Sequence, residues 1–502
     1  MDNTKLVGKL VSGTGFGLIG SIGGRLINVI SSIFIARVLG PTYFGLYSIG
    51  WTLIRFMSLL ATLGMDRVIL KFAPRFLEND KPALRGLLFR AIGVSISSGL
   101  LGGIFLFFVS PWLAIVVYQK PELVSVFKLF SIAFPPIIAL SVVAASSRIT
   151  QKMQYSVFIQ DIGQSLIGLV LMIFFYLIGL SLIGIILADV ISNIIALIAG
   201  AGILLYLFPE IFKIKSIIRI TYKEMFGFSF PAVLAGAFSV YIFWIDRVLV
   251  GYFRTTFENG IYQSVSQIST IFLVISAGIN MIVVPMFANY YQNNDKKGLE
   301  EIYRISTKWG IYLSIPIIGI LIISPKEVIS FIYGSQYIIG SNLLLVLIIG
   351  QVINLFTGSV NPLLIMTGNQ SFLFRLSGIV LFFDLLLNLI LIPSFGLIGA
   401  AISTSVSLSI LYIVALFWVK RKLFLWPFDR RYFKGVLAGS ASLLGIYIVK
   451  LFFPLMNGMN LLLQGFTGII VFSFSIFIQK LDYEDYELIN KLKRFIFKRK
   501  TI

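Results

Sequence analysis

Apolar stretches about 20 residues long recur from one end of this 502-residue chain to the other. That is roughly the length an α-helix needs to cross the hydrocarbon core of a bilayer. Only 12% of the residues are charged, and the mean hydropathy is +0.96, whereas a soluble domain carries about 25% charged residues. Because lipid offers no water to unpaired backbone groups, each stretch is expected to be a helix. The sequence therefore predicts an all-α polytopic membrane protein.

The positive charges indicate how the helices are oriented. We predict fourteen transmembrane helices at residues 14–36, 44–64, 87–109, 124–145, 157–178, 182–207, 226–250, 260–287, 309–331, 339–366, 372–393, 396–419, 432–454 and 458–479. If residues close to a helix end are counted with the adjoining loop, 32 of the 41 Lys and Arg residues fall on the side of the termini and the even-numbered loops, 7 fall on the other side, and 2 lie deep within helices. Positive charge in short loops stays cytoplasmic. We expect a multi-pass protein of the cell membrane with both termini in the cytoplasm.

The same charge count accounts for the formal net charge of +20 without a nucleic-acid partner. The chain has no cysteine and no histidine, which excludes disulfides, thiol or imidazole nucleophiles and the usual zinc and haem ligands. It also contains no Gly-x-x-x-x-Gly-Lys-Ser/Thr phosphate loop. We expect no enzymatic activity and no bound cofactor.

A short sequence motif, called the corner motif below, occurs twice. "ARVLGPTYFGLYS" follows the first predicted helix, and "DRVLVGYFRTTFENGIYQ" follows the seventh. Aligning Gly45 with Gly260 gives an offset of 215 residues, and Asp80 matches Asp295 at the same offset. Gly184 in "SLIGIILA" also falls on Gly399 in "GLIGAAIS" at 215. A nearly constant offset over so long a stretch indicates an internal duplication.

The duplication divides the chain into predicted parts. Residues 1–215 form an N-lobe with helices one to six, and residues 216–422 form a C-lobe with helices seven to twelve. Residues 423–480 hold two further helices, and residues 481–502 form a basic cytoplasmic tail expected to lie against anionic headgroups. Six helices is an even number, so the two pseudo-symmetric lobes form a parallel repeat. In transporters built this way, substrate sites lie between the lobes.

Two arginines lie near the middle of predicted helices, Arg25 in the first and Arg55 in the second. Asn28 shares one helical face with Arg25. A charge at that depth costs about 2.5–3.5 kcal/mol, so it normally faces a cavity or a partner. Arg25, Asn28 and Arg55 are therefore candidates for binding an anionic headgroup. The alternative is a structural ion pair within the lobe, for which Asp189 is the obvious carboxylate.

The C-lobe carries acids instead. Asp246, Asp384, Asn388 and Thr404 are predicted to lie at overlapping depths in the outer half of the bilayer. Two carboxylates, an amide and a hydroxyl form an all-oxygen set suited to a hard cation such as Na⁺. Protons carried by the two carboxylates would serve the same coupling role. Alternatively, Asp246 and Arg247 could neutralise each other as an interfacial pair.

Polar side chains also form stripes on two C-lobe helices. The stripes are predicted to line a water-filled cavity, although single hydroxyls in such helices often bond to their own backbone. The candidate cavity-lining residues are Ser266, Thr270, Asn280, Asn354 and Asn361.

The two corner motifs resemble the polysaccharide biosynthesis family, the O-antigen and lipid-linked oligosaccharide flippases of the multidrug/oligosaccharidyl-lipid/polysaccharide exporter superfamily. The resemblance covers the whole chain, including the two extra helices and the cytoplasmic termini. It implies two six-helix lobes that open alternately to either side and move an isoprenoid diphosphate-linked oligosaccharide to the outer leaflet. The spacing of Asp246, Asp384, Asn388 and Thr404 is similar to the sodium site of lipid II flippases, a related family.

Two other functions within the superfamily stay open. A lipid II flippase would also have fourteen helices and cavity arginines. A multidrug/cation antiporter would be expected to have buried acids for cationic drugs and twelve helices. The expected partners are the lipid-linked oligosaccharide and membrane lipids, with Na⁺ or H⁺ as the coupling ion. The protein itself is expected to be a monomer.

Overall fold

The structure is a computed structural model that describes residues 3–77, 79–150, 152–210, 213–453, 458–480, 482 and 484–486. Helices make up 87% of the residues that the structure describes, and these residues include no strand. Twelve of the described helices are long and apolar enough to cross a membrane. This confirms the prediction of an all-α polytopic membrane protein.

The chain separates into two compact units, Met1–Ser264 with Leu385–Ala400, and Val265–Asp384 with Ala401–Ile502. This division follows packing density within the structure. The lobe boundaries at residues 215 and 422 stay a prediction, as does the two-lobe layout.

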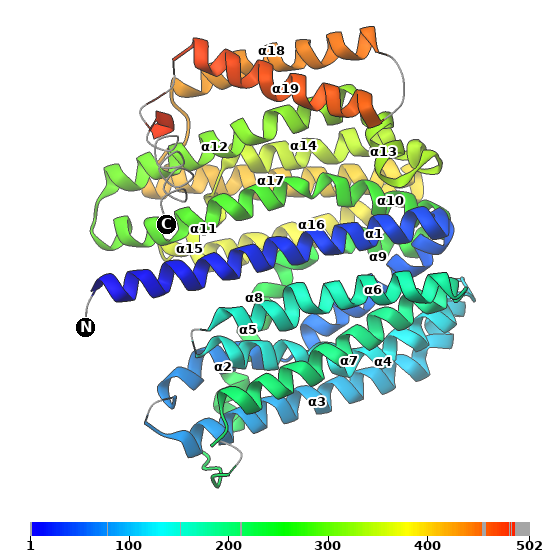
Figure 1. The fold of residues 1–502 in the computed structure, drawn as a ribbon, viewed down its shortest axis with the longest axis vertical. Helices are drawn as coiled ribbons and strands as arrows, with labels where there is room; N and C mark the ends of the chain where they lie inside the picture. Colours follow the sequence, from blue (N-terminus) through cyan, green and yellow to red (C-terminus); the bar gives the residue numbers. More distant parts are fainter. Residues whose placement is uncertain are drawn as a thin grey trace, which may run out of the picture. The chain divides into compact units, whose positions relative to one another are not determined.

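The first unit is built from the N-terminal helices (Figure 1). Its elements are α1 (Asn3–Ala61), α2 (Met65–Phe72), η1 (Ala73–Arg75), α3 (Lys81–Trp112), η2 (Leu113–Val117), α4 (Leu123–Arg148), α5 (Met153–Ser156), η3 (Val157–Gly163), α6 (Gln164–Leu177), α7 (Ser181–Leu207), α8 (Tyr222–Tyr241), α9 (Ile245–Phe253) and most of α10 (Thr256–Ser269). In α1 the first two predicted helices are continuous apart from a kink at Gly40, which has φ 74° and precedes Pro41. Proline cannot continue the preceding hydrogen-bond ladder, so it explains the kink.

Helix α4 forms the interior of this unit. It packs against α3 and α7, and 67% of its membrane-spanning window is buried, compared with 22% for α3. The core combines Met65 and Leu84 with Val142 and Leu204, which come from four different helices. The opposite face of α3 exposes large apolar side chains such as Leu101 and Phe108. We infer that this face of α3 contacts lipid.

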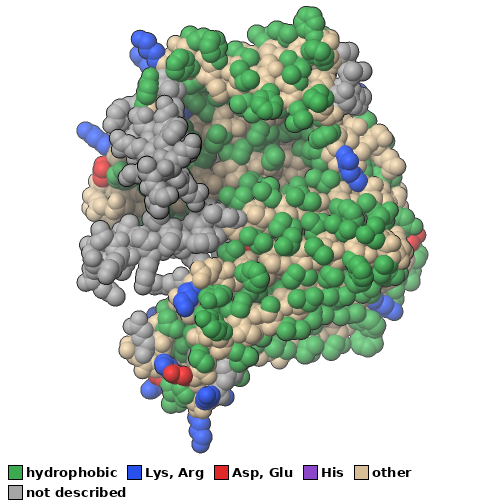
Figure 2. All heavy atoms as spheres, in the orientation of Figure 1, with side chains coloured by type: hydrophobic (Ala, Val, Ile, Leu, Met, Phe, Trp, Pro, Cys, Tyr) green, Lys and Arg blue, Asp and Glu red, His purple; other side chains and the backbone are tan. Residues whose placement is uncertain are grey.

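The second unit contains α11 (Ile271–Gln292), α12 (Lys296–Ile323), α13 (Pro325–Tyr333), η4 (Ser335–Gly340), α14 (Ser341–Thr357), α15 (Val360–Met366), α17 (Leu397–Leu423), α18 (Arg431–Phe452), α19 (Gly458–Ile478) and most of α16 (Gln370–Phe395). Helices α18 and α19 pack on each other and on α12 (Figure 1). Figure 2 shows hydrophobic side chains covering the outer flanks of α18 and α19, as expected of a lipid-facing surface.

Several predicted helices are interrupted in the structure. Residues 226–250 form α8 and the short α9, and residues 260–287 form α10 and α11 with a break at Thr270. Residues 339–366 are broken at Gly358, where φ is 64° and only glycine avoids a clash with Thr307. These residues are helical as predicted, but the predictions missed the breaks, because hydropathy does not respond to a single turn.

Acidic residues after α19 are anchored to α12. Lys308 is almost fully buried, and its Nζ lies 3.1 Å from Asp482, 2.6 Å from Glu484 and 3.0 Å from Asp485. Trp309 donates a further hydrogen bond of 3.1 Å from Nε1 to Asp485. The start of the predicted tail is thus held by charge pairing to α12. Its basic part, residues 487–502, lies outside the described residues.

Candidate functional site

The two repeated corners pack directly on each other within the first unit. A Cβ atom built on Gly45 would lie 1.8 Å from the carbonyl oxygen of Thr256, and one on Gly260 would lie 2.0 Å from that of Pro41. Pro41 and Thr256 are related by the same 215-residue offset as Gly45 and Gly260, so the contact is reciprocal. Reciprocity of this kind is expected where two copies meet across a two-fold axis. Only glycine permits so close an approach of two backbones.

A tyrosine two residues after each corner glycine donates to a carboxylate. Tyr47 Oη donates to Asp189 Oδ2 at 2.5 Å, and Tyr262 Oη donates to Asp246 Oδ2 at 2.6 Å. Both tyrosines are buried. Tyr47 and Tyr262 are equivalent in the repeat, whereas their two carboxylate partners are not. Each repeat therefore uses the same donor to fix a different acid.

Arg55 lies two turns after Tyr47 on α1. Its guanidinium is 5.2 Å from the centroid of the Trp51 ring and interacts electrostatically with Asp189 and Tyr47. No ion pair connects Arg55 to any residue that the structure describes, and its side chain is exposed. Asp189 accepts a hydrogen bond from Tyr47 and also attracts Arg55 electrostatically. The role of Arg55 in binding an anionic headgroup stays a prediction.

Arg25 and Asn28 are exposed on the first half of α1. Arg25 interacts electrostatically with Asp161, which also interacts with Arg148. Asp161 belongs to η3, a π-helical segment whose backbone contacts Gly24: a Cβ there would lie 2.6 Å from the Asp161 oxygen. Isolated π-helical turns occur frequently at functional sites. Asp161 could not be singled out from the sequence, because nothing in residues 157–163 predicts a π-turn.

The four residues of the candidate ion site are divided between the units. Asp246 and Asn388 belong to the first unit, and Asp384 and Thr404 belong to the second. All four are buried, and Asp384 and Asn388 lie one turn apart on α16. Their use as a Na⁺ or proton site stays a prediction.

The alternative pairing of Asp246 with Arg247 also stays a prediction, but the structure gives both residues other contacts. The guanidinium of Arg247 lies 4.3 Å from the Trp244 ring centroid, and Asp246 Oδ1 accepts a hydrogen bond of 2.7 Å from the backbone N–H of Arg247. The Trp244 ring lies 5.1 Å from that of Trp51.

The candidate cavity-lining residues behave in two ways. Thr270 Oγ1 donates to the carbonyl oxygen of Gln267 at 2.8 Å, which is the backbone-bonding alternative. Ser266 Oγ, Asn280 Oδ1 and Asn361 Oδ1 are buried and have no hydrogen-bond partner among the described residues. Buried polar atoms are normally paired, so these three are suited to contacting water.

The stripes also lie at helix breaks. Thr270 occupies the junction of α10 and α11, and Gly358 separates Asn354 on α14 from Asn361 on α15. Asn354 is buried. Interrupted helices line the binding sites of many membrane transporters. Their role in lining a cavity stays a prediction.

Comparison with known proteins identifies the family. The polysaccharide biosynthesis protein family matches residues 34–340, more than half of the chain and including both corner motifs. The chain belongs to this family. It is similar to the "Probable low-salt glycan biosynthesis flippase Agl15" of Haloferax volcanii, with 25% identity over 189 residues, which are 38% of this chain and 40% of the relative. The match thus spans less than half the length of that relative.

Solved structures show the fold. The lipid II flippase MurJ in an inward closed conformation has a TM-score of 0.72 at 18% identity, covering 93% of this chain and 98% of MurJ. An inward-facing multidrug resistance MATE family transporter of the MOP superfamily has a TM-score of 0.65 at 16% identity, covering 80% of this chain and 94% of that one. The protein is therefore a multi-pass membrane protein with a MurJ/MATE-like fold.

Proposed function

We propose that this protein is a flippase that moves an isoprenoid diphosphate-linked oligosaccharide from the cytoplasmic to the outer leaflet by alternating access. Membership of the polysaccharide biosynthesis family supports a glycan cargo, and the name of the Haloferax volcanii relative supports translocation. The protein transports and does no covalent chemistry. It acts as a monomer in the cell membrane, with lipid-linked glycan and membrane lipids as its partners.

The proposal includes a specific topology. Counting α1 as two spans at the Gly40 kink and adding α8 to the twelve long apolar helices gives fourteen crossings. The distribution of Lys and Arg then supports cytoplasmic termini.

The observation that carries the proposal is Arg55. A charged group at membrane depth normally faces a partner or a water-filled cavity. Asp189, a candidate partner, accepts a hydrogen bond from Tyr47 and attracts Arg55 electrostatically, but Arg55 is exposed and forms no ion pair with a described residue. A guanidinium binds phosphate oxygens through two parallel hydrogen bonds and stays charged when partly desolvated. Arg25, which is also exposed and has no such ion pair, supplies a second cation on the same kinked helix. Together they suit a diphosphate.

Transport measurements in proteoliposomes with a defined lipid-linked oligosaccharide test this function. Arg55→Ala removes the fork that binds phosphate and should lower the apparent substrate affinity about tenfold to a hundredfold. Arg55→Lys keeps the charge but loses the paired geometry, so it should restore only part of the affinity. Arg375→Ala is the matched control, because that arginine is exposed at the start of α16 and bonds only to the backbone of Ser371.

The competing structural role predicts a different result. If Arg55 mainly compensates Asp189, Arg55→Ala should reduce stability while substrate affinity per folded molecule is unchanged, and Asp189→Asn in the same chain should restore stability. That outcome would reject the headgroup assignment. Repeating the assay with lipid II distinguishes the two flippase functions, since both substrates carry a diphosphate but different sugars.

Ion coupling is the remaining part of the proposal. Asp246, Asp384, Asn388 and Thr404 are proposed to bind Na⁺, or the two acids to carry protons. The burial of all four supports it, because a buried carboxylate must be protonated, paired or bound to a cation.

A further inference from the structure

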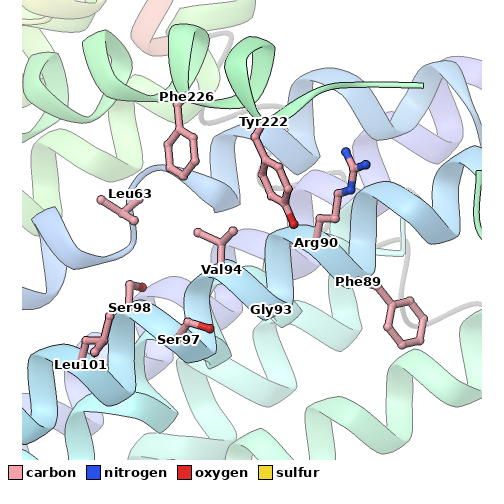
Figure 3. A pocket seen from close by; sticks show the side chains of 10 residues that line it. All are labelled: Leu63, Phe89, Arg90, Gly93, Val94, Ser97, Ser98, Leu101, Tyr222 and Phe226. Carbon is pink, nitrogen blue, oxygen red and sulfur yellow. The ribbon is translucent and has the colours of Figure 1, made fainter. Parts of the chain in front are cut away.

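A groove on the first unit lies apart from the residues assigned to the substrate and the ion. It has a volume of about 560 Å³ and is bounded by the end of α1, by α3 and by the start of α8 (Figure 3). Its lining residues are Leu63, Phe89, Arg90, Gly93, Val94, Ser97, Ser98, Leu101, Tyr222 and Phe226. Leu101 and Phe89 are exposed, so the groove opens on the lipid-facing side of α3.

The groove has the length of one lipid leaflet. In the proposed topology α3 starts on the cytoplasmic side at Lys81, and Arg90 lies near the start of the apolar stretch. Eleven residues separate Arg90 from Leu101, which corresponds to about 16 Å along a helix. Half of the hydrocarbon core is about 15 Å. The groove therefore runs from headgroup depth to roughly the bilayer midplane.

Its cytoplasmic end is cationic. One amino group of Arg90 donates to the carbonyl oxygen of Ile220 at 2.5 Å, and the guanidinium lies 4.8 Å from the Tyr222 ring centroid. These contacts fix the side chain but use only one of its two amino groups, so further N–H groups remain to bind an anion. Lys223 follows Tyr222 and is exposed. A phosphate at this end would meet the positive charge of Arg90.

The rest of the groove is mainly apolar. In Figure 3, Phe226 extends from α8 toward Val94 on α3, and Leu63 closes one side. Gly93 forms part of the floor, and a Cβ built on it would have no neighbour within 4 Å. The missing side chain therefore leaves open space in the groove, and this space is suited to a hydrocarbon chain.

We propose that this groove is a binding site for one anionic phospholipid of the cytoplasmic leaflet, with its phosphate at Arg90 and an acyl chain along Gly93, Val94 and Leu101. Charge complementarity selects an anionic over a zwitterionic lipid, and the apolar floor selects a lipid over a free phosphate. The site goes beyond the proposed transport function. It would fasten α8 to α3 through a ligand that bridges both.

Lipid retention by the purified full-length protein tests the site. The protein is equilibrated with mixed micelles of phosphatidylglycerol and phosphatidylcholine, and the bound lipid is counted by native mass spectrometry. The wild type should retain one phosphatidylglycerol preferentially. Arg90→Gln should lower its apparent affinity about tenfold. Gly93→Leu should do the same by filling the floor while leaving the charge intact.

Arg375→Gln is the control for a loss of positive charge elsewhere, and Arg90→Lys shows whether charge alone restores binding. Equal retention of the two lipids by the wild type would overturn the proposal, as would equal affinity in Arg90→Gln and Arg375→Gln. If Gly93→Leu lowered retention of a lipid-linked oligosaccharide but not of phosphatidylglycerol, the groove would belong to the substrate tail and the proposal would also fail. Because lipid retention does not depend on transport, a failed flippase assay would leave this result unaffected.

Discussion

The reciprocal contact between Gly45 and Gly260 can be tested by adding one methyl group. In Gly45→Ala the new Cβ would start 1.8 Å from the backbone oxygen of Thr256, whereas an ordinary contact begins at 3.4 Å. No flexible side chain can move aside, so the two helices must separate by more than 1 Å. Overpacking of this kind costs about 1–3 kcal/mol, and a backbone obstacle favours the upper end of that range.

A matched control removes the effect of helix propensity. Gly202 is also helical, and a Cβ built on it would have no neighbour within 4 Å. Gly202→Ala and Gly45→Ala gain the same propensity, so the difference between them reports the clash alone. The free energy of unfolding in mixed micelles, followed by circular dichroism, should be about 3 kcal/mol lower for Gly45→Ala than for Gly202→Ala.

The double variant gives a sharper test. Gly260→Ala meets the backbone oxygen of Pro41 on the same surface, so a separation that relieves one clash also relieves part of the other. Gly45→Ala with Gly260→Ala should therefore cost less than the sum of the two single variants. Stability of both single variants equal to that of Gly202→Ala would refute the contact, and strict additivity would refute its reciprocity.

Three further predictions follow from the structure. Asp384→Asn should abolish the dependence of transport on the ion gradient while leaving the fold intact, and unchanged dependence in liposomes with imposed Na⁺ and H⁺ gradients would exclude Asp384 from coupling. Because the chain has no cysteine, Glu122→Cys and Asn294→Cys can be labelled singly in intact cells with an impermeant maleimide; only Glu122→Cys should react, and labelling of both or of Asn294→Cys alone would reject the topology. Burial disfavours the charged form of Glu484, but hydrogen bonds from Lys308 and Arg431 outweigh it and lower the pKa of Glu484 overall. The stabilisation from this charge is therefore complete above the unfolded-state pKa of about 4.3. It is lost as the pH falls through the lower pKa of the folded state, so the tail should detach at low pH. Limited proteolysis should release the tail at low pH, and in Lys308→Met at neutral pH, whereas equal protection under all conditions would contradict the anchor.

Hydropathy was sufficient to predict the class of fold but not the breaks within its helices. A run of apolar residues predicts a helix whether or not one turn within it is irregular. The breaks at Thr270 and Gly358 depend on single backbone positions, and Gly358 is required by its positive φ and by Thr307 from another helix. The contact with Thr307 is tertiary, but the positive φ of Gly358 is a local requirement. The break in "FTGSVNP" could therefore have been identified from its Gly and Pro.

The candidate site was predictable in composition but not in pairing. Depth within a predicted helix was enough to single out Arg25 and Arg55, because charge is rare there. The partners were not predictable in the same way. Asp161 approaches α1 through a π-helical turn, and Asp189 is engaged by Tyr47 across 142 residues of sequence. One feature of the sequence could have identified Tyr47 and Tyr262 as functional. They are equivalent in the repeat, and a tyrosine present in both copies two residues after the corner glycine indicates a shared role.

The two copies of the repeat differ in the positions of their charged residues. Asp189 aligns with Thr404 at the offset of 215 residues, and Asp246 aligns with Ser31, so neither acid has an acidic counterpart. The arginines follow the same rule, because Arg55 aligns with Thr270 and Arg25 with Val240. The cations therefore belong to the first copy, and the candidate ion ligands to the second. A ligand shifts a conformational equilibrium only through its different affinities for the two states. If the copies move relative to each other, an anion bound by the first and a cation bound by the second bias that movement through separate contacts. Such an arrangement allows an ion gradient to drive an anionic substrate without competing for the same side chains.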